Sequence, residues 1–420
     1  MPNQFFSPEG DLENYFVTES WLIDQWVGDE LWTWGYGNNG RLGNAVVTGS
    51  ISTPVTTFAG GTNWKQVACG SNHTAAIKTD GTLWTWGSAS NGQLGNAVVT
   101  GSISTPVTTF AGGTNWKQVA CGNLNHTAAI KTDGTLWTWG SAGNGRLGNG
   151  ATTGNISTPV TTFAGGTNWK QVACGSNHTA AIKTDGTLWT WGAGDRGQRG
   201  ESAISYTEKT VTGSIARFSF FINTSNTNGV NIGDTLLTRY NGGLVVNVVT
   251  NSYIEMQFDN TQVLLTGDFV FALLPPASIS TPVTTFAGGT NWKQVACGHN
   301  STSAIKTDGT LWTWGYNISG QIGDNTSLIN RLTPVTTFAG GTNWKQVTGG
   351  LSHTSAIKTD GTLWIWGAGG NGRLGNAVTT GNISTPVTTF AGGTNWKQVS
   401  GGSAHTAAVF SGTTPDLPIS

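Results

Sequence analysis

The sequence predicts an all-β fold, a six-bladed β-propeller carrying a small inserted β domain, and three observations support this prediction. The phrase Asn-Trp-Lys-Gln-Val occurs six times. Its Trp residues are 52, 53, 123, 52 and 52 residues apart, so one interval is 71 residues longer than the shortest. Helical periodicity is absent from the repeat, and the repeat length is that of one four-stranded propeller blade.

Each repeat reads as four short strands. In one copy, Trp64 to Cys69 and His73 to Thr79 are the first two, and Thr82 to Trp86 follows after an Asp80-Gly81 turn. Asp-Gly between alternating segments indicates a hairpin, and the expected type I′ turn requires positive φ. A segment that starts at proline, such as Pro54 to Phe58, supplies the fourth strand. A β-solenoid is the alternative arrangement of such repeats.

The ends of the repeat array favour a closed ring. The array opens with Leu31 to Trp34, which lacks its preceding strands, and finishes with Trp396-Lys-Gln-Val and His405 to Phe410, which lack the last strand. If these segments pair, they complete a sixth blade and remove two open sheet edges. The sequence therefore predicts a propeller closed by pairing of its N- and C-terminal strands.

The segments outside the repeats differ from them in character. The segment 201–277 has no Trp and no repeat phrase, and its short apolar runs predict five or six strands of a β-sandwich or barrel. Apolar residues at helical spacing near the N-terminus predict an amphipathic arm, which either caps the propeller or docks the protein on a larger assembly. We therefore expect five parts: a partly helical N-terminal arm (1–30), the first part of the propeller (31–200), the inserted domain (201–277), the second part of the propeller (278–410) and a C-terminal tail (411–420).

Composition argues against several classes of partner. Only 10% of residues are charged, with 20 basic against 21 acidic, so the whole chain shows no basic footprint for nucleic acid. We read neither a signal peptide nor a run of eighteen apolar residues, and we expect no membrane insertion. The four cysteines share one repeat position, which predicts small buried residues rather than a redox or metal set.

Residue types that often act in catalysis or ligand binding recur in this sequence about once per repeat. Five histidines share one position, which predicts packing and hydrogen bonding; a shared metal site would need them to converge. Three Gly-x-Gly-x-x-Gly matches open no helix, so turns explain them better than dinucleotide binding. No Cys/His or Ser/His/Asp set is unique to one place. We expect no enzyme activity, catalytic residue, metal or cofactor. The histidines are His73, His126, His178, His353 and His405, with Ser301 at this position in the fourth copy.

The repeats diverge most in the loop after each Trp-Gly. Residues that are identical among the copies are explained by their common packing. Residues that differ among the copies are therefore better candidates for recognition of a partner. We expect these loops to crown one face of the propeller and bind a partner. The candidate recognition residues are Tyr36, Asn38, Asn39, Ser90, Asn91, Asp195, Arg196, Tyr316, Asn317, Asn325 and Arg331.

The repeat resembles that of the RCC1 (regulator of chromosome condensation) superfamily of β-propellers. The residues that carry the resemblance are Leu83-Trp-Thr-Trp-Gly87, Asn91-Gly-Gln-Leu-Gly95, Pro106-Val, Val119-Ala-Cys-Gly122 and His126-Thr127. The resemblance covers about three quarters of the chain and implies a propeller. Because well-known members of the family have seven blades, a degenerate seventh blade in the long interval is the alternative to an inserted domain.

A second resemblance concerns function. The opening segment, from Gln4 to Gly28, is similar to the leaders of repeat proteins encoded by marine cyanobacterial bacteriophages. It implies a virion structural protein, made in the host cytoplasm and placed in the tail, its fibres or another surface position. Its expected partners are other virion proteins in an oligomeric assembly and a glycan or protein of the host envelope. The alternatives are an RCC1-type regulator, acting in nucleotide exchange or chromatin binding, and a propeller that binds or inhibits another protein.

Overall fold

The computed structural model describes residues 30–200, 278–377, 380–403 and 405–410, together with six strands within 201–277. The chain divides into two compact units, Glu201–Ala277 and the remainder. The described residues are almost entirely β structure; the helices among them are three single-turn 3-10 segments, η1 (Asn38–Gly40), η2 (Gly143–Gly145) and η3 (Gly370–Gly372). Among these residues, no helix is long and apolar enough to cross a membrane.

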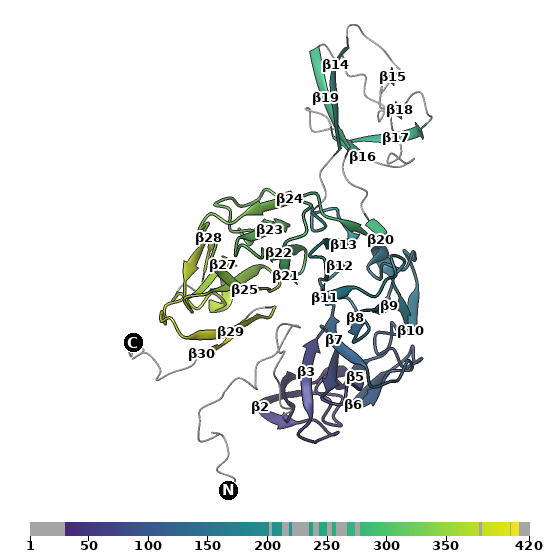
Figure 1. Cartoon of the computed structure of the whole chain (residues 1–420), viewed down its shortest axis with the longest axis vertical. Helices are drawn as coiled ribbons and strands as arrows, with labels where there is room; N and C mark the ends of the chain where they lie inside the picture. The colour runs from purple at the N-terminus through teal and green to yellow at the C-terminus, as the bar shows by residue number, and fades with distance from the viewer. Residues whose placement is uncertain are drawn as a thin grey trace. The chain divides into compact units, whose positions relative to one another are not determined.

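Five complete blades follow one another in chain order, each a four-stranded antiparallel sheet. Their first strands surround the centre of the ring, as Figure 1 shows. Blade 1 contains β3 (Trp64–Cys69), β4 (His73–Lys78), β5 (Leu83–Ser88) and β6 (Ser102–Thr108). Blade 2 contains β7 (Trp116–Cys121), β8 (His126–Lys131), β9 (Leu136–Ser141) and β10 (Asn155–Thr161). Blade 3 contains β11 (Trp169–Cys174), β12 (His178–Lys183), β13 (Leu188–Ala193) and β20 (Ser278–Thr284). Blade 4 contains β21 (Trp292–Cys297), β22 (Ser301–Lys306), β23 (Leu311–Gly315) and β24 (Arg331–Thr336). Blade 5 contains β25 (Trp344–Gly349), β26 (His353–Lys358), β27 (Leu363–Ala368) and β28 (Asn382–Thr388).

Two half-blades flank these five. The strands β1 (Trp32–Tyr36) and β2 (Ser50–Thr56) form one two-stranded sheet, and β29 (Trp396–Gly401) and β30 (Thr406–Phe410) form another. The array therefore occupies seven successive places, five of them with complete blades, which agrees with the RCC1-like propeller predicted from the sequence.

The predicted pairing of the terminal strands is wrong for this structure. β1 pairs with β2 and β30 pairs with β29, and no ladder joins β1 to β30 in the described part of the chain. Trp34 is 37% exposed, whereas the equivalent Trp86 is 0% exposed. The physical reason is that each half-blade packs against the complete blade next to it: Thr74 and Trp86 of blade 1 both donate to Arg41 O, and His353 of blade 5 bonds to Thr406. Near-identical junctions impose near-identical angles, and the sum of these angles keeps the two halves in separate places.

The Asp-Gly hairpins form, but with a different turn from the one expected. Gly81 N donates to Lys78 O at 2.9 Å, so Thr79 and Asp80 are the central residues of the turn. Neither has positive φ, and Gly81 follows them at φ 79°. This is the three-residue connection in which a left-handed glycine follows the turn, in place of type I′.

Tryptophan side chains fill the space between blades. Trp86, Trp139, Trp191, Trp314 and Trp366 are 0% exposed, which confirms that these rings are core. Within each blade the ring of the first strand meets this Trp edge-on, as Trp64 meets Trp86 with centroids 6.2 Å apart. The four cysteines are free thiols; Cys121, Cys174 and Cys297 are buried as expected, and Cys69 is half-buried.

The unit 201–277 lies within the connection between the third and fourth strands of blade 3, since β13 pairs with β20. Its described strands form one six-stranded antiparallel sheet in the order β14-β19-β16-β17-β18-β15, where the sequence predicted a sandwich or barrel. The first and last strands pair, Ile204 with Leu273, which brings the two ends of the insert together. The strands are β14 (Ile204–Val211), β15 (Phe218–Phe220), β16 (Thr235–Leu237), β17 (Gly243–Val249), β18 (Ile254–Gln257) and β19 (Gly267–Leu273).

Residues 1–29 of the expected N-terminal arm (1–30) and the whole C-terminal tail (411–420) lie outside the described residues.

Candidate functional site

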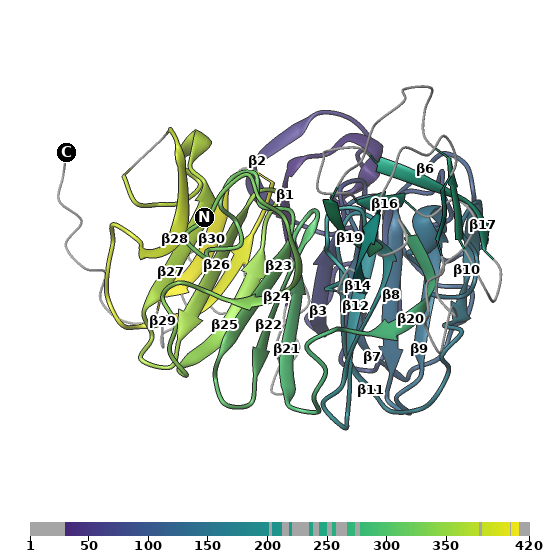
Figure 2. The same ribbon diagram turned by 90° about the horizontal axis from the view of Figure 1, so that it is seen from above.

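The two ends of the propeller ring carry different connections. Because neighbouring strands are antiparallel, the links between first and second strands and between third and fourth strands lie at one end. We call this end the variable face. The Asp-Gly turns and the links from one blade to the next lie at the other end, the repeat face; there Trp116 N, at the start of blade 2, donates to Gly81 O. Figure 2 shows the strands of the blades running side by side between these two ends.

All predicted recognition residues lie in the links between third and fourth strands on the variable face, or next to them. Five are exposed: Tyr36, Asn39, Ser90, Asp195 and Asn325. Asn38, Asn91, Arg196, Tyr316 and Arg331 are half-buried. Asn317 is 0% exposed, and its proposed role in direct recognition is therefore wrong.

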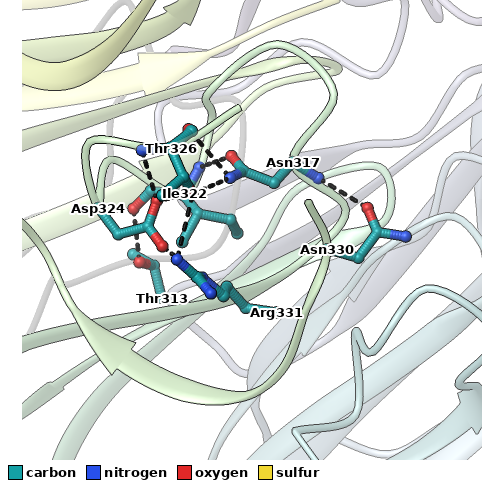
Figure 3. A network of polar contacts seen from close by, with 7 residues as sticks. All are labelled: Thr313, Asn317, Ile322, Asp324, Thr326, Asn330 and Arg331. Carbon is teal, nitrogen blue, oxygen red and sulfur yellow. Dashed lines mark hydrogen bonds and ion pairs between the residues drawn. The ribbon is translucent and has the colours of Figure 1, made fainter. Parts of the chain in front are cut away.

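The amide of Asn317 instead organises the loop of blade 4 (Figure 3). Its nitrogen donates to Thr326 O at 3.1 Å and to Thr326 Oγ1 at 3.0 Å, while its oxygen accepts from Ile322 N at 3.0 Å. Asp324 accepts from the Thr326 hydroxyl and forms an ion pair with Arg331. This network fixes the loop backbone from within.

The fixed loop presents apolar side chains to solvent. Leu328 is 75% exposed, Ile329 is 57% exposed and Ile318 is 44% exposed. Leu328 also has a φ of 67°, a backbone conformation that is unfavourable for a bulky residue, and its N donates to Asn317 O at 2.9 Å. Neither side-chain packing nor backbone preference accounts for an exposed leucine in this conformation.

The loop of blade 3 meets that of blade 4. The Arg196 guanidinium carbon lies 4.5 Å from the centre of the Tyr316 ring. Asp195 Oδ2 is 3.7 Å from Arg196 Nε, and both side chains are largely in solvent, so this ion pair contributes little to stability. Two predicted recognition residues from different blades, Arg196 and Tyr316, are thus in contact.

Sequence reasoning missed two other departures from the repeat at this junction. Arg199 replaces the leucine or isoleucine buried at this position in the other copies, yet it is 1% exposed and donates to Gly192 O at 2.7 Å. A Cβ on Gly194 would lie 2.3 Å from the Arg199 guanidinium carbon, so any larger residue at 194 would displace this side chain. His299 bonds to Ser176 of blade 3, and burial, followed by the nearby Arg196 charge, lowers the pKa of His299. The available signal was a charged residue, Arg199, at a position where the other five copies have leucine or isoleucine.

The repeated histidines do join neighbouring blades, which confirms their packing role. His73 Nε2 lies 2.9 Å from Thr127 Oγ1, and Thr127 Oγ1 in turn donates to Gln93 O at 2.8 Å. Since that hydroxyl has only one hydrogen, the imidazole must be the donor, and the proton therefore resides on Nε2. Trp139 Nε1 also donates to Gln93 O, at 2.9 Å. One carbonyl thus accepts from two groups of the following blade.

The glycine before each histidine makes room for the ring. A Cβ on Gly122 would lie 2.0 Å from His126 Cε1. His73, His126 and His178 are 0% exposed and His353 is 1% exposed, whereas His405 of the terminal half-blade is exposed. The described residues contain no group of three or more His, Cys, Asp or Glu side chains arranged to hold a metal ion.

The hairpin aspartates also have a local structural role. Asp80 Oδ1 accepts from Thr82 Oγ1 at 2.7 Å and from Thr82 N at 2.9 Å. The hydrogen bond from the Thr82 hydroxyl is the main reason that the pKa of Asp80 lies below its usual value. The equivalent bonds recur at the other four hairpin aspartates, Asp133, Asp185, Asp308 and Asp360.

Comparison with protein families matches the RCC1 repeat, "Regulator of chromosome condensation", to residues 29–77, 80–130, 133–182, 308–357 and 360–409. A second model of the same repeat matches residues 64–93, 116–146, 169–198 and 292–321. The chain belongs to the RCC1 repeat family. The ultraviolet-B receptor UVR8 of Arabidopsis thaliana is 28% identical over 350 residues, which are 83% of this chain and 63% of UVR8.

Two solved structures show the same RCC1 fold at low identity. Human WBSCR16 has a TM-score of 0.64 and 19% identity, with 91% of this chain and 82% of that chain covered. Yeast RCC1 (Prp20), solved with Kap60 bound, has a TM-score of 0.62 and 17% identity, with 96% and 80% covered. At this level of identity the likeness concerns the fold alone.

The histidine bonds lead to a prediction for pH. Burial lowers the pKa of His73 to about 3, whereas an unfolded histidine titrates near 6.5. The stability that neutral His73 contributes is present above pH 6.5 and is lost as the pH falls towards 3, because only the unfolded state binds the proton in that range. From pH 7 to pH 5, we expect the free energy of unfolding to fall by about 2 kcal/mol less in His73→Ser than in the unsubstituted chain.

Urea unfolding at both pH values measures this difference. Serine is the matched replacement because Ser301 occupies the same position in blade 4. Equal pH dependence of the two chains would show that His73 is not held neutral by the fold.

Proposed function

We propose that this RCC1-family propeller is a non-enzymatic protein-binding module that recognises its partner through the blade 3 and blade 4 loops of the variable face. The single observation that carries the proposal is the loop of blade 4, in which a buried polar network holds Leu328 and Ile329 in solvent. Arg196 and Tyr316 lie in contact where the loops of blades 3 and 4 meet. Arg and Tyr are enriched at interface hot spots, and apolar side chains such as Leu328 and Ile329 suit the apolar core of an interface.

Rigidity of the loop strengthens this interpretation. A loop ordered before binding loses little conformational entropy when its partner arrives, so more of the contact energy appears as affinity. Asn317, Asp324 and Arg331 supply that order. They should therefore support binding without touching the partner.

The proposal is tested by pull-down from a lysate of the source cells with the full chain and with Leu328→Gly. Glycine removes the exposed side chain and also relieves the positive φ, so we expect stability to be unchanged or higher and retention of the partner to fall at least about tenfold. The matched control is Val99→Ala, in the corresponding loop of blade 1, where Val99 is 47% exposed. A partner retained equally by all three chains would contradict the assignment of this loop.

We propose a bacteriophage virion as the setting of this binding, with the chain made in the host cytoplasm. Two sequence features support it: the near-identity of copies such as 51–61 and 103–113, and the resemblance of the opening segment to phage leaders. Near-identical repeats fit a gene that expands by recombination. In that setting the partners would be other virion proteins in an oligomeric assembly, or a protein or glycan of the host envelope.

Mass spectrometry of purified virions tests this setting, and we expect peptides of the chain in stoichiometric amount. Absence of the chain from the particle would favour the alternative, an RCC1-type regulator. UVR8 is named as a receptor. In a cellular role of that kind, the variable face of this chain would bind another protein of the same cell.

A further inference from the structure

The repeat face carries a ring of lysines to which the proposed binding site gives no role. Each is the second residue of an innermost strand, next to the buried Trp that opens the strand. The innermost strands touch one another through glutamine side chains: Gln66 Nε2 donates to Val119 O at 3.3 Å. These lysines therefore surround the axis of the propeller. They are Lys117, Lys170, Lys293, Lys345 and Lys397, which are exposed, and Lys65, which is half-buried.

Among the described residues, no ion pair involves a lysine of this ring, although the five hairpin aspartates place carboxylates on the same face. The ion pairs of the described part of the chain join Arg196 to Asp195 and Arg331 to Asp324, on the variable face. The hairpin aspartates of the repeat face bond to threonines, as Asp80 does to Thr82. The lysines at the ends of the second strands are also on this face, where Lys78 lies over the rings of Trp64 and Trp84.

The repeat face also exposes one phenylalanine per repeat. These side chains follow the fourth strand of each blade, are between 58% and 75% exposed, and are Phe58, Phe110, Phe163, Phe286, Phe338 and Phe390. These phenylalanines are available for apolar contacts at the edge of the repeat face. An occupant that supplies both negative charge and apolar groups therefore fits this face.

The charge of the chain is divided sharply between its parts. Residues 30–200 and 278–410 contain 17 basic and eight acidic side chains, a net charge of +9. Residues 1–29 contain six acidic side chains and no basic one, and the segment 201–277 contains six acidic and three basic. The near-neutral total of −1 conceals a basic propeller preceded by an acidic segment. That segment also contains six aromatic residues, Phe5, Phe6, Tyr15, Phe16, Trp21 and Trp26.

The acidic segment joins the propeller at the repeat face. Leu31 O accepts from Thr57 N at 3.2 Å, and Thr57 begins the link to the next blade on that face. A chain of 29 residues extends up to roughly 95 Å, whereas a compact unit of this size has a radius of gyration of about 20 Å. Residues 1–29 are therefore long enough to reach every lysine of the ring.

We propose that residues 1–29 dock within the same chain on the repeat face, their six carboxylates over the lysine ring and their aromatic side chains among the exposed phenylalanines. Complementary charge and the point of attachment both favour this occupant over an unrelated acidic partner.

Protection of residues 1–29 from a glutamate-specific protease tests the proposal in the full chain. Cleavage after Glu9, Glu13 and Glu19 is followed by mass, relative to a free peptide of residues 1–29 at the same salt. At 50 mM NaCl we expect cleavage about fivefold or more slower than in the peptide, and at 500 mM NaCl the protection should largely disappear because salt screens exposed charges.

Two sets of substitutions isolate the ring. Replacing all six lysines by Gln should remove the protection at 50 mM NaCl, while replacing the same six by Arg should keep it. Cleavage of the unsubstituted chain at the rate of the free peptide would overturn the proposal, as would equal protection in the Gln variant. Protection that disappears on dilution from 50 to 1 μM would overturn docking within one chain and assign the surface to a second copy.

Discussion

Every junction between complete blades depends on a backbone carbonyl that follows a glycine of the variable loop, in an Asn-Gly, Arg-Gly or Ser-Gly pair. At Gln93 O this carbonyl accepts from the Thr127 hydroxyl and from the Trp139 indole, and His73 donates to the same hydroxyl. A second bond nearer the axis, between Val119 N and Gln66 Oε1 at 3.1 Å, joins the innermost strands. A buried carbonyl that accepts two hydrogen bonds tolerates little displacement, because each lost bond leaves an unsatisfied group in the core. The angle between blades is therefore fixed by short, repeated polar contacts as well as by tryptophan packing.

That constraint explains both the regular and the irregular parts of the molecule. Blades built from nearly identical residues make nearly identical junctions, and the half-blades at the two ends pack against their neighbours in the same way. We therefore expect function to reside in segments that differ among the repeats and take no part in the repeated contacts between blades. These are the loop of blade 4, the Arg196 and Tyr316 contact, and the connection of blade 3 that carries the segment 201–277.

The repeat phrase and the strand and turn signals predicted the blades and the packing role of the histidines, since these depend on local pattern and on equivalence among copies. The loops were predicted as variable, but not that Asn317 would turn inward, because amide orientation depends on contacts made within the folded loop. Pairing of the terminal strands was predicted from complementary ends alone, whereas the angle between blades decides where those ends lie. The basic propeller was missed because the charge was averaged over the whole chain, although the sequence contains the division plainly.

Amide hydrogen exchange of the terminal strands tests most directly the claim that fixed junctions hold the half-blades apart. In β26 and β27 both strands are flanked by partners, whereas β1 and β30 each have one unpaired edge in the described structure. The account predicts that Thr406–Phe410 and Trp32–Tyr36 exchange orders of magnitude faster than His353–Lys358 and Leu363–Ala368. Equal protection of the terminal and internal strands would contradict it, because such protection requires β1 and β30 to pair in a single closed blade.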